Sequence, residues 1–210
     1  MVPVKDTSPL QHGESSLLEQ PAAIRRPPPF VVPPFVVVTG GPGAGKSTLV
    51  AALAAAGVAT QAEAGRAVIR AQSAAGGTAL PWIDPAAFAA RMLDHDRRSY
   101  RDAWRRGVPC VFDRGIPDSA GYLDLVGLPV PAVLARAARR LRYAAILVAP
   151  HWPGIYHNDA ERRQTPEEAR RTEERVCQAY RACGYEPVPL PRASVAERVG
   201  FVLDILRRLG

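Results

Sequence analysis

The chain has 210 residues, a length that fits one domain with a single core and an additional tail. Apolar residues make up 47% and charged residues 22%, so the chain can bury a core, and full disorder is excluded. No apolar run approaches the roughly 20 residues of a bilayer-spanning helix, so no membrane span is expected.

The net charge of +7 is compatible with an anionic ligand. Arginines follow acids at the spacing of one helical turn in the pairs Asp94 and Arg98, Asp102 and Arg106, and Glu167 and Arg171. Such pairs are typical of solvated helix faces, so we do not expect nucleic acid as a partner. The three cysteines form no Cys-x-x-Cys pair, and no export signal is recognised, which favours a cytoplasmic location.

Residues 1–34 form a proline-rich segment that holds eight of the 21 prolines and whose charges cancel. Proline lacks an amide donor and favours extended backbone, so we expect a flexible tail outside the sheet. The domain is then expected to span residues 35–210. The tail is the candidate segment for contact with a protein partner.

From Phe35 onward, short β-rich runs alternate with helical stretches, the pattern of an α/β fold whose parallel sheet has crossover helices. Five strands are predicted, at residues 35–39, 58–62, 109–113, 144–149 and 186–190. Capping residues predict that one helix begins after Thr165 and another after Ser194. Their predicted buried stripes are Ala169, Thr172, Val176, Ala179 and Cys183 in the first helix, and Val195, Val199, Val202, Leu206 and Leu209 in the second.

Residues 40–47 match the Walker A pattern of Gly, four residues and Gly-Lys-Ser, directly after the first predicted strand. Such a loop turns backbone amides toward a phosphate, and the helix that follows adds its positive end. Lys46 is expected to reach the outer phosphates, Ser47 to bind Mg²⁺ and Thr48 to contact the innermost phosphate. The predicted nucleotide-binding residues are Gly41, Gly43, Ala44, Gly45, Lys46, Ser47 and Thr48.

Asp113 and Arg114 end the third predicted strand, at the edge where parallel sheets bind ligands. Asp113 is expected to bind Mg²⁺ or an acceptor hydroxyl, and Arg114 to steady a phosphate or the acceptor. A hydrolytic ATPase of the motor or AAA+ type would have glutamate after this aspartate, so Arg114 favours transfer over hydrolysis. The alternative is a salt bridge at a strand end.

Glu63 follows the second predicted strand, and its carboxylate is expected to accept a proton from an attacking hydroxyl. The alternative is a structural charge at a helix N-terminus. Arg66 lies three residues later and is a candidate for substrate binding. Asp118 and Tyr122, one turn apart on the helix after Arg114, either contact the acceptor or only cap and pack.

Residues 159–164 form a polar stretch between the fourth strand and the Thr165 helix. Phosphoryl transfer requires cations that close over the triphosphate, and Arg162 and Arg163 are the candidates for this lid. The alternative is a solvated charge run. The sequence contains no Asn-Lys-x-Asp guanine-recognition element, so ATP is the expected donor and GTP the alternative.

Together, these residues resemble the predicted AAA-type ATPase family that is grouped with the ribosylnicotinamide kinase domain. The resemblance rests on the Walker loop, Glu63 with Arg66, the run Phe-Asp-Arg-Gly-Ile-Pro-Asp with Tyr122, and Asp159 with Arg162. It covers about residues 35–208 and implies a P-loop kinase-like fold, a bound nucleoside triphosphate with Mg²⁺, and a helical lid.

The sequence thus favours a Mg²⁺-dependent kinase that transfers the γ-phosphoryl group to a hydroxyl of a small acceptor, with Asp113 or Glu63 activating that hydroxyl. One alternative is a nucleotide-gated protein that switches a partner through the proline-rich tail. A weaker alternative is an enzyme that acts on nucleic acid.

Overall fold

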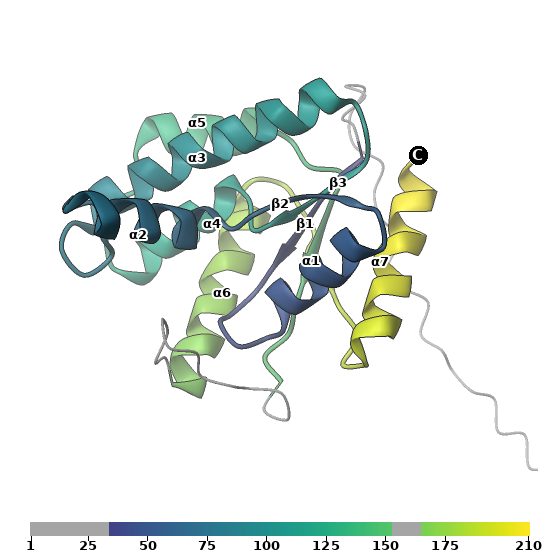
Figure 1. Cartoon of the computed structure of the whole chain (residues 1–210). Coiled ribbons are helices and arrows are strands. Elements are labelled where there is room, and N and C mark those ends of the chain that lie inside the picture. Colours follow the sequence, from purple (N-terminus) through teal and green to yellow (C-terminus); the bar gives the residue numbers. More distant parts are fainter. Residues whose placement is uncertain (1–33, 153–164) are drawn as a thin grey trace, which may run out of the picture.

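The computed structural model describes residues 34–152 and 165–210. All pairings in its five-stranded sheet are parallel, and the strand order is β2-β3-β1-β4-β5. The strands are β1 (Phe35–Thr39), β2 (Ala59–Gln61), β3 (Cys110–Asp113), β4 (Ala145–Val148) and β5 (Val188–Pro189). The helices of the described residues are α1 (Lys46–Ala55), α2 (Ala64–Ala75), α3 (Pro85–Arg106), α4 (Ile116–Leu125), α5 (Ala132–Arg140), α6 (Pro166–Ala182) and α7 (Val195–Leu209) (Figure 1). The predicted α/β class is therefore confirmed.

Each predicted strand contains the observed one, and the largest difference is at β5. Only Val188–Pro189 pair with β4, although residues 186–190 were predicted. Pro187 and Pro189 have no amide hydrogen to donate, which limits pairing on this edge strand.

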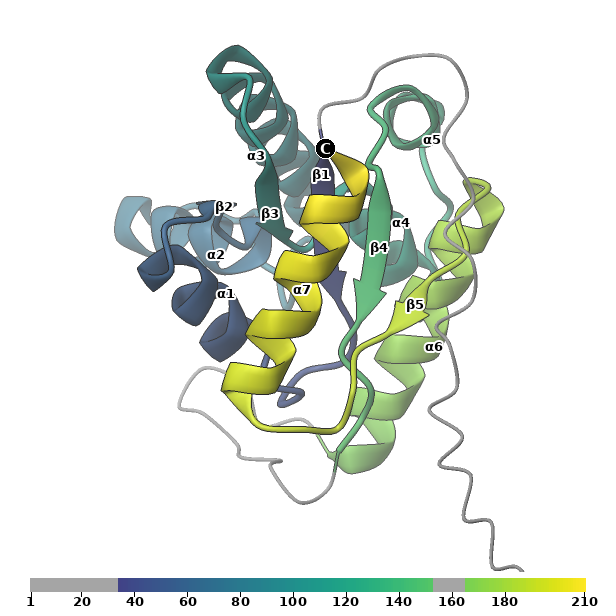
Figure 2. The same ribbon diagram turned by 90° about the vertical axis from the view of Figure 1, so that its right-hand side faces the viewer.

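Helices cover both faces of the sheet, as Figure 2 shows. The alternating side chains of β1 divide between the two layers. Val36 and Val38 belong to the core cluster beneath α1 and α7, whereas Phe35 and Val37 pack with residues of α3 and α6. This strand is buried along its whole length, so its carboxyl end is fixed in the middle of the molecule. No described helix is both long and apolar enough to cross a membrane.

Both predicted helix starts are confirmed by capping bonds. The hydroxyl of Thr165 accepts from the backbone amide of Glu168 at 3.2 Å, and that of Ser194 accepts from the amide of Glu197 at 3.3 Å. In each motif the glutamate also accepts from the backbone amide of the cap residue. These caps fix where α6 and α7 begin.

The predicted stripes on these helices are wrong in part. Tyr180 is fully buried on α6, although the predicted stripe did not include it. On α7 the buried face contains Arg198, whereas Val195 is 41% exposed. Val195 is the first residue of the helix, and the buried positions begin one turn later, at Arg198.

Several arginines on the helix surfaces pair with acids, but not with the predicted partners. Asp102 pairs with Arg105 at 3.6 Å and Glu167 with Arg170 at 2.8 Å, each three residues apart rather than four. Both spacings bring side chains together on a helix. Among the described residues, Arg98 has no ion pair with Asp94.

Candidate active site

The phosphate loop joins β1 to α1 at the carboxyl end of the central strand (Figure 1). Gly43 and Gly45 have φ angles of 72° and 77°, a backbone region that side chains with a Cβ atom rarely adopt. Gly45 is also the N-cap of α1, so the amides of the first helical turn follow directly. The residues predicted to bind nucleotide all lie in this loop or in the first turn of α1, which gives the loop the form of an anion site.

Lys46 is the lysine of the Walker motif and is only 5% exposed. Its ammonium group donates a hydrogen bond to the carbonyl oxygen of Gly41 at 2.5 Å. This bond spans the loop and places the positive charge against the segment that would surround a phosphate. Ser47 and Thr48 are exposed on the first turn of α1, where a ligand can reach their hydroxyls.

Asp113 ends β3 and lies opposite Val38 of β1 in the parallel register. One of its carboxylate oxygens accepts a hydrogen bond from the Ser47 hydroxyl at 3.2 Å. The other oxygen is buried and has no hydrogen-bond partner among the described residues. Burial and the nearby charge of Glu63 raise the pKa of Asp113, and Lys46 counteracts this in part.

This pair of residues fits a hard cation. Mg²⁺ prefers oxygen ligands and is usually held by one or two protein oxygens together with substrate phosphates. The Ser47 hydroxyl and the unpartnered Asp113 oxygen supply such oxygens beside the phosphate loop. The two residues that the sequence predicts to bind Mg²⁺ therefore lie within hydrogen-bond distance of each other.

Arg114 joins two acidic residues that are distant in the sequence. Its Nε donates to Glu63 at 3.2 Å, and its NH1 donates to Asp118 at 2.9 Å. Glu63 also forms an ion pair with Arg66 at 3.3 Å. Among the described residues, Arg114 is the one non-glycine residue with positive φ, 70°, so its backbone is strained at this point.

Glu63 is the N-cap residue of α2 and is 6% exposed. Its side chain makes no capping hydrogen bond to the helix, and its two oxygens face Arg66 and Arg114 instead. A helix-terminal position and a carboxylate held by two arginines are therefore both present. The second property is the one that proton transfer requires.

The carboxylate of Asp118 is used inside the protein. It accepts hydrogen bonds from the Thr39 hydroxyl at 2.6 Å, Arg114 at 2.9 Å, the Gly115 amide at 2.9 Å and the Tyr180 hydroxyl at 2.7 Å. Four donors occupy the lone-pair sites of an ionised carboxylate. The structure therefore favours the capping and packing interpretation of Asp118 over acceptor contact.

Tyr122 lies one turn after Asp118 and packs edge-on against Phe88, with 5.4 Å between the ring centres. Its hydroxyl is buried and has no hydrogen-bond partner among the described residues. Burial raises the pKa of Tyr122 to about 12, so the hydroxyl stays a neutral donor. Arg162 and Arg163, predicted to form the lid, lie outside the described residues.

Comparison with known proteins places the chain in a family. A family model described as an AAA domain matches residues 35–198, which include the phosphate loop and every site residue discussed above. The chain belongs to this AAA domain family. The match confirms the resemblance found in the sequence, whereas no curated protein matches the chain.

The fold of the chain is similar to those of two solved kinases and of the NadR protein. The structure of the NadR protein in complex with NR superposes with a TM-score of 0.59 at 18% identity, over 84% of this chain and 50% of that one. This chain thus spans about half the length of the NadR chain. A deoxyadenosine kinase from M. mycoides gives a TM-score of 0.58 at 12% identity, covering 83% and 99% of the two chains. A shikimate kinase from Acinetobacter baumannii gives 0.51 at 14% identity, covering 85% and 96%.

The AAA domain also contains a buried arginine that the sequence analysis did not identify. Arg198 of α7 is 3% exposed, and it donates to the carbonyl oxygen of Pro191 at 2.9 Å and to that of Ala44, in the phosphate loop, at 3.1 Å. Its guanidinium lies 5.1 Å from the ring centre of Trp152. Arg198 lies four residues before the buried Val202, so helical spacing contained the indication that it faces inward.

Proposed function

We propose that this protein is a Mg²⁺-dependent kinase that transfers the γ-phosphoryl group of ATP to a hydroxyl of a small acceptor. The observation that carries the proposal is the contact between Ser47 and Asp113 beside the loop of Lys46. It joins a phosphate site to a cation site at the carboxyl ends of two adjacent strands. These are the two parts that phosphoryl transfer needs first.

In this proposal, Lys46 and the loop amides bind and orient the outer phosphates. Ser47 and Asp113 hold Mg²⁺, which when bound neutralises the charge on the phosphate oxygens. Arg162 and Arg163 remain the candidates for closing over the triphosphate. ATP is preferred to GTP because the sequence has no guanine-recognition element of the Asn-Lys-x-Asp type.

Glu63 is the better candidate for taking the proton of the acceptor hydroxyl. The carboxylate of Asp113 already contacts Ser47 and is assigned to Mg²⁺, which leaves Glu63 as the second carboxylate of the site. Arg66 and Arg114 hold its two oxygens in one orientation, as a general base requires. Arg114 thus serves the acceptor indirectly, by positioning Glu63.

The acceptor is expected to be a hydroxylated metabolite or a nucleoside-like molecule. The buried Tyr122 hydroxyl has no hydrogen-bond partner among the described residues, lies on α4 one turn after Asp118, and suits a polar atom of such an acceptor. The proteins with similar folds were solved with NR, with shikimate, and with dCMP and dCDP. These ligands support a small acceptor, although the likeness itself concerns only the fold.

A screen with γ-labelled ATP and Mg²⁺ against nucleosides, nucleotides and hydroxylated metabolites tests the proposal. We expect label on one acceptor class, loss of transfer in Lys46→Ala and Asp113→Asn, and unchanged transfer in the exposed control Asp124→Asn. Release of inorganic phosphate with no labelled acceptor would contradict the kinase proposal. It would favour the nucleotide-gated switch instead.

A further inference from the structure

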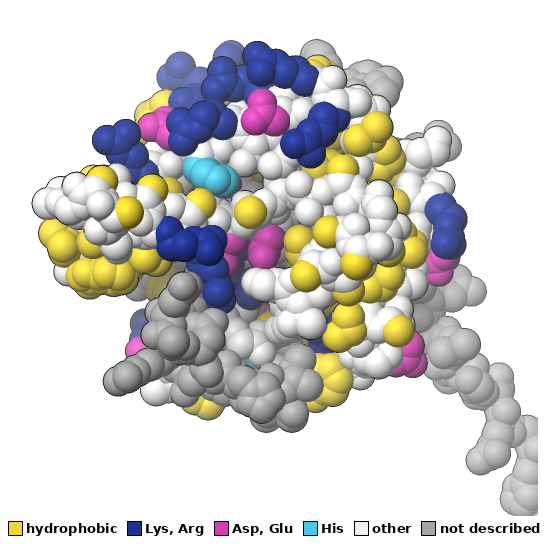
Figure 3. Space-filling view, in the orientation of Figure 1, with side chains coloured by type: hydrophobic (Ala, Val, Ile, Leu, Met, Phe, Trp, Pro, Cys, Tyr) yellow, Lys and Arg dark blue, Asp and Glu magenta, His cyan; other side chains and the backbone are white. Residues whose placement is uncertain are grey.

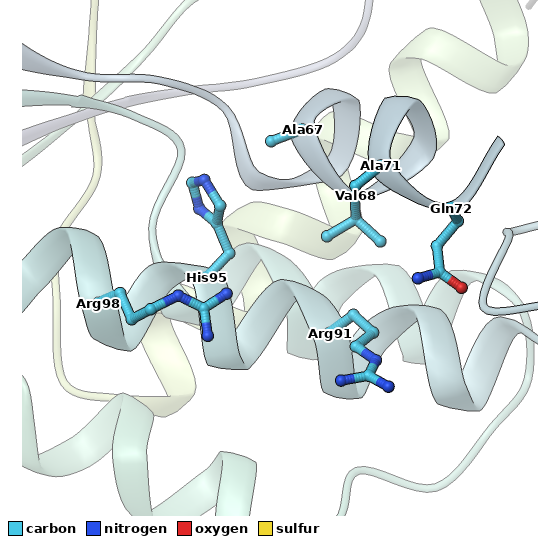
Figure 4. A pocket seen from close by; sticks show the side chains of 7 residues that line it. All are labelled: Ala67, Val68, Ala71, Gln72, Arg91, His95 and Arg98. Atoms are coloured by element: carbon cyan, nitrogen blue, oxygen red, sulfur yellow. The ribbon is translucent and has the colours of Figure 1, made fainter. Parts of the chain in front are cut away.

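A groove lies between α2 and α3 (Figure 4), and no residue of the phosphate loop lines it. Its volume is about 220 Å³, and its apolar lining comes from α2, from residues Ala67, Val68 and Ala71. Ligand pockets for drug-sized molecules are larger, roughly 300–1,000 Å³. The groove is therefore suited to a small chemical group.

Three side chains of α3 face this groove. Arg91, His95 and Arg98 lie four and three residues apart, which brings them to one face of the helix. Among the described residues, neither the Arg91 nor the Arg98 side chain has an ion pair or a hydrogen bond. Figure 3 shows that Lys and Arg side chains gather over this upper face of the molecule, with a histidine among them.

The α2 side of the groove supplies a further donor, Gln72. Its side-chain oxygen accepts a hydrogen bond from the backbone amide of Ala79 at 3.1 Å. This bond fixes which end of the amide is which, so the NH₂ group faces the groove, as in Figure 4. No carboxylate lines the groove among the described residues. Its polar lining thus consists of donors and one imidazole.

His95 experiences the positive charge of this surface. Burial and the charge of Arg98 lower the pKa of its imidazole. Its Nδ1 lies 3.5 Å from the Ser99 hydroxyl, and of the other residues that line the groove only Arg91 and Arg98 carry a charge. An anion in the groove would oppose this lowering of the His95 pKa, because a nearby negative charge favours the protonated imidazole.

We propose that the groove between α2 and α3 binds the oxyanion group, phosphate or carboxylate, of a small molecule at a second site. Unpaired guanidinium groups are strong donors to such oxyanions, and the Gln72 amide adds a donor from the opposite wall. The groove shares no residue with the proposed kinase site. Gln72 lies nine residues after Glu63, about half a turn out of phase on the same helix. The inference goes beyond the kinase proposal and does not depend on it.

The test uses the full chain, saturated with Mg²⁺ and a nonhydrolysable ATP analogue so that the phosphate loop is filled. Inorganic phosphate, glycerol phosphate and succinate are titrated separately, and NMR follows the His95 imidazole, assigned with His95→Gln. We expect a saturable shift and a raised His95 pKa with at least one probe. The tighter of the phosphate and carboxylate probes identifies the oxyanion class.

Variants distinguish specific binding in the groove from nonspecific attraction of anions by surface charge. The double variant Arg91→Gln with Arg98→Gln is expected to weaken binding by about tenfold or more, because it removes two charged donors. Gln72→Glu should weaken binding as well, because it replaces a donor with a repelling negative charge. The control Arg105→Gln removes an exposed arginine of the same helix that pairs with Asp102, and it should change binding by less than about twofold.

Shifts that never saturate, or an equal loss in Arg105→Gln, would overturn the proposal. Thermal unfolding of each variant shows whether it is folded. Lys46→Ala, which tests the phosphate loop, should leave binding in the groove unchanged, so the two proposals can fail independently.

Discussion

At the scale of single residues, Asp118 connects three parts of the domain. It is 7% exposed, and its donors come from β1, from the turn after β3 and from α6. Arg114 would retain only Glu63 as a hydrogen-bonded acid if this charge were removed. Asp118→Asn should therefore lower the free energy of unfolding by about 3 kcal/mol, as expected when one partner of a buried ion pair is lost.

Urea denaturation of Asp118→Asn beside Asp124→Asn checks this expectation. Asp124 lies on the same helix, is 51% exposed and pairs with Arg175 at 3.1 Å. Its replacement should cost less than about 1 kcal/mol, because exposed ion pairs contribute little. Similar losses of unfolding free energy in the two variants would show that the hydrogen bonds of Asp118 contribute no more to stability than an exposed ion pair.

Asp96 of α3 is a second buried acid, 9% exposed, whose carboxyl group has no hydrogen bond or ion pair among the described residues. Burial and the charges of Asp118 and Glu63 raise its pKa well above the usual range. A carboxyl group with a raised pKa in the folded state makes the protein less stable as pH rises from its unfolded pKa toward its folded pKa. Asp96→Asn should therefore raise the free energy of unfolding near neutral pH, by about 1 kcal/mol or more.

The measurement is the free energy of unfolding of Asp96→Asn at acidic and neutral pH. The decline in stability toward neutral pH should be smaller than in the unmodified protein. Asp94→Asn, an exposed change two residues away, should leave the pH dependence as it is. A parallel pH dependence in all three proteins would contradict the assignment to Asp96.

At the scale of elements, α4 and α6 approach each other closely at Gly121. A Cβ atom on this residue would lie 2.9 Å from Cα of Val176 and 3.1 Å from the carbonyl oxygen of Arg175, both in the backbone of α6. A helix backbone cannot yield as a side chain does, so Gly121→Ala must push the helices apart. We expect a loss of about 2 kcal/mol in the free energy of unfolding.

The matched control is Gly200→Ala in α7, where nothing lies within 4 Å of the added Cβ atom. This change should stabilise the protein by about 0.5–1 kcal/mol, since alanine is the better helix former. Opposite changes in the free energy of unfolding for the two variants, in one denaturation series, would establish the close contact. An increase in both variants would show that a Cβ atom at residue 121 fits between α4 and α6.

The sequence predicted these elements well where local patterns decide them. Two capping motifs fixed the starts of α6 and α7, and short β-rich runs located each strand within a few residues. The buried faces of the helices were harder, because burial depends on which neighbour each helix meets. Tyr180 and Arg198 carry polar groups, which a stripe drawn from apolar residues leaves out, although both are buried.

At the scale of the whole molecule, the rule that parallel strands end at one edge was enough to bring Ser47 and Asp113 together, and Glu63 near them. This rule could not show which charged side chains pair with each other. Arg114 binds two acids rather than standing free, and Asp118 meets donors from Thr39 and Tyr180, which lie 79 and 62 residues away in the chain. Such partners are set by the packed fold and leave no local pattern.

The central position of β1 has a consequence for how the protein is made. Its neighbours β3 and β4 lie far downstream, since Phe35 pairs with Cys110 and Val36 with Ala145. A ribosome therefore releases the nucleotide-binding segment long before either flank of that strand has been synthesised. A nucleotide bound at this loop therefore cannot stabilise the packed sheet until both neighbouring strands have emerged.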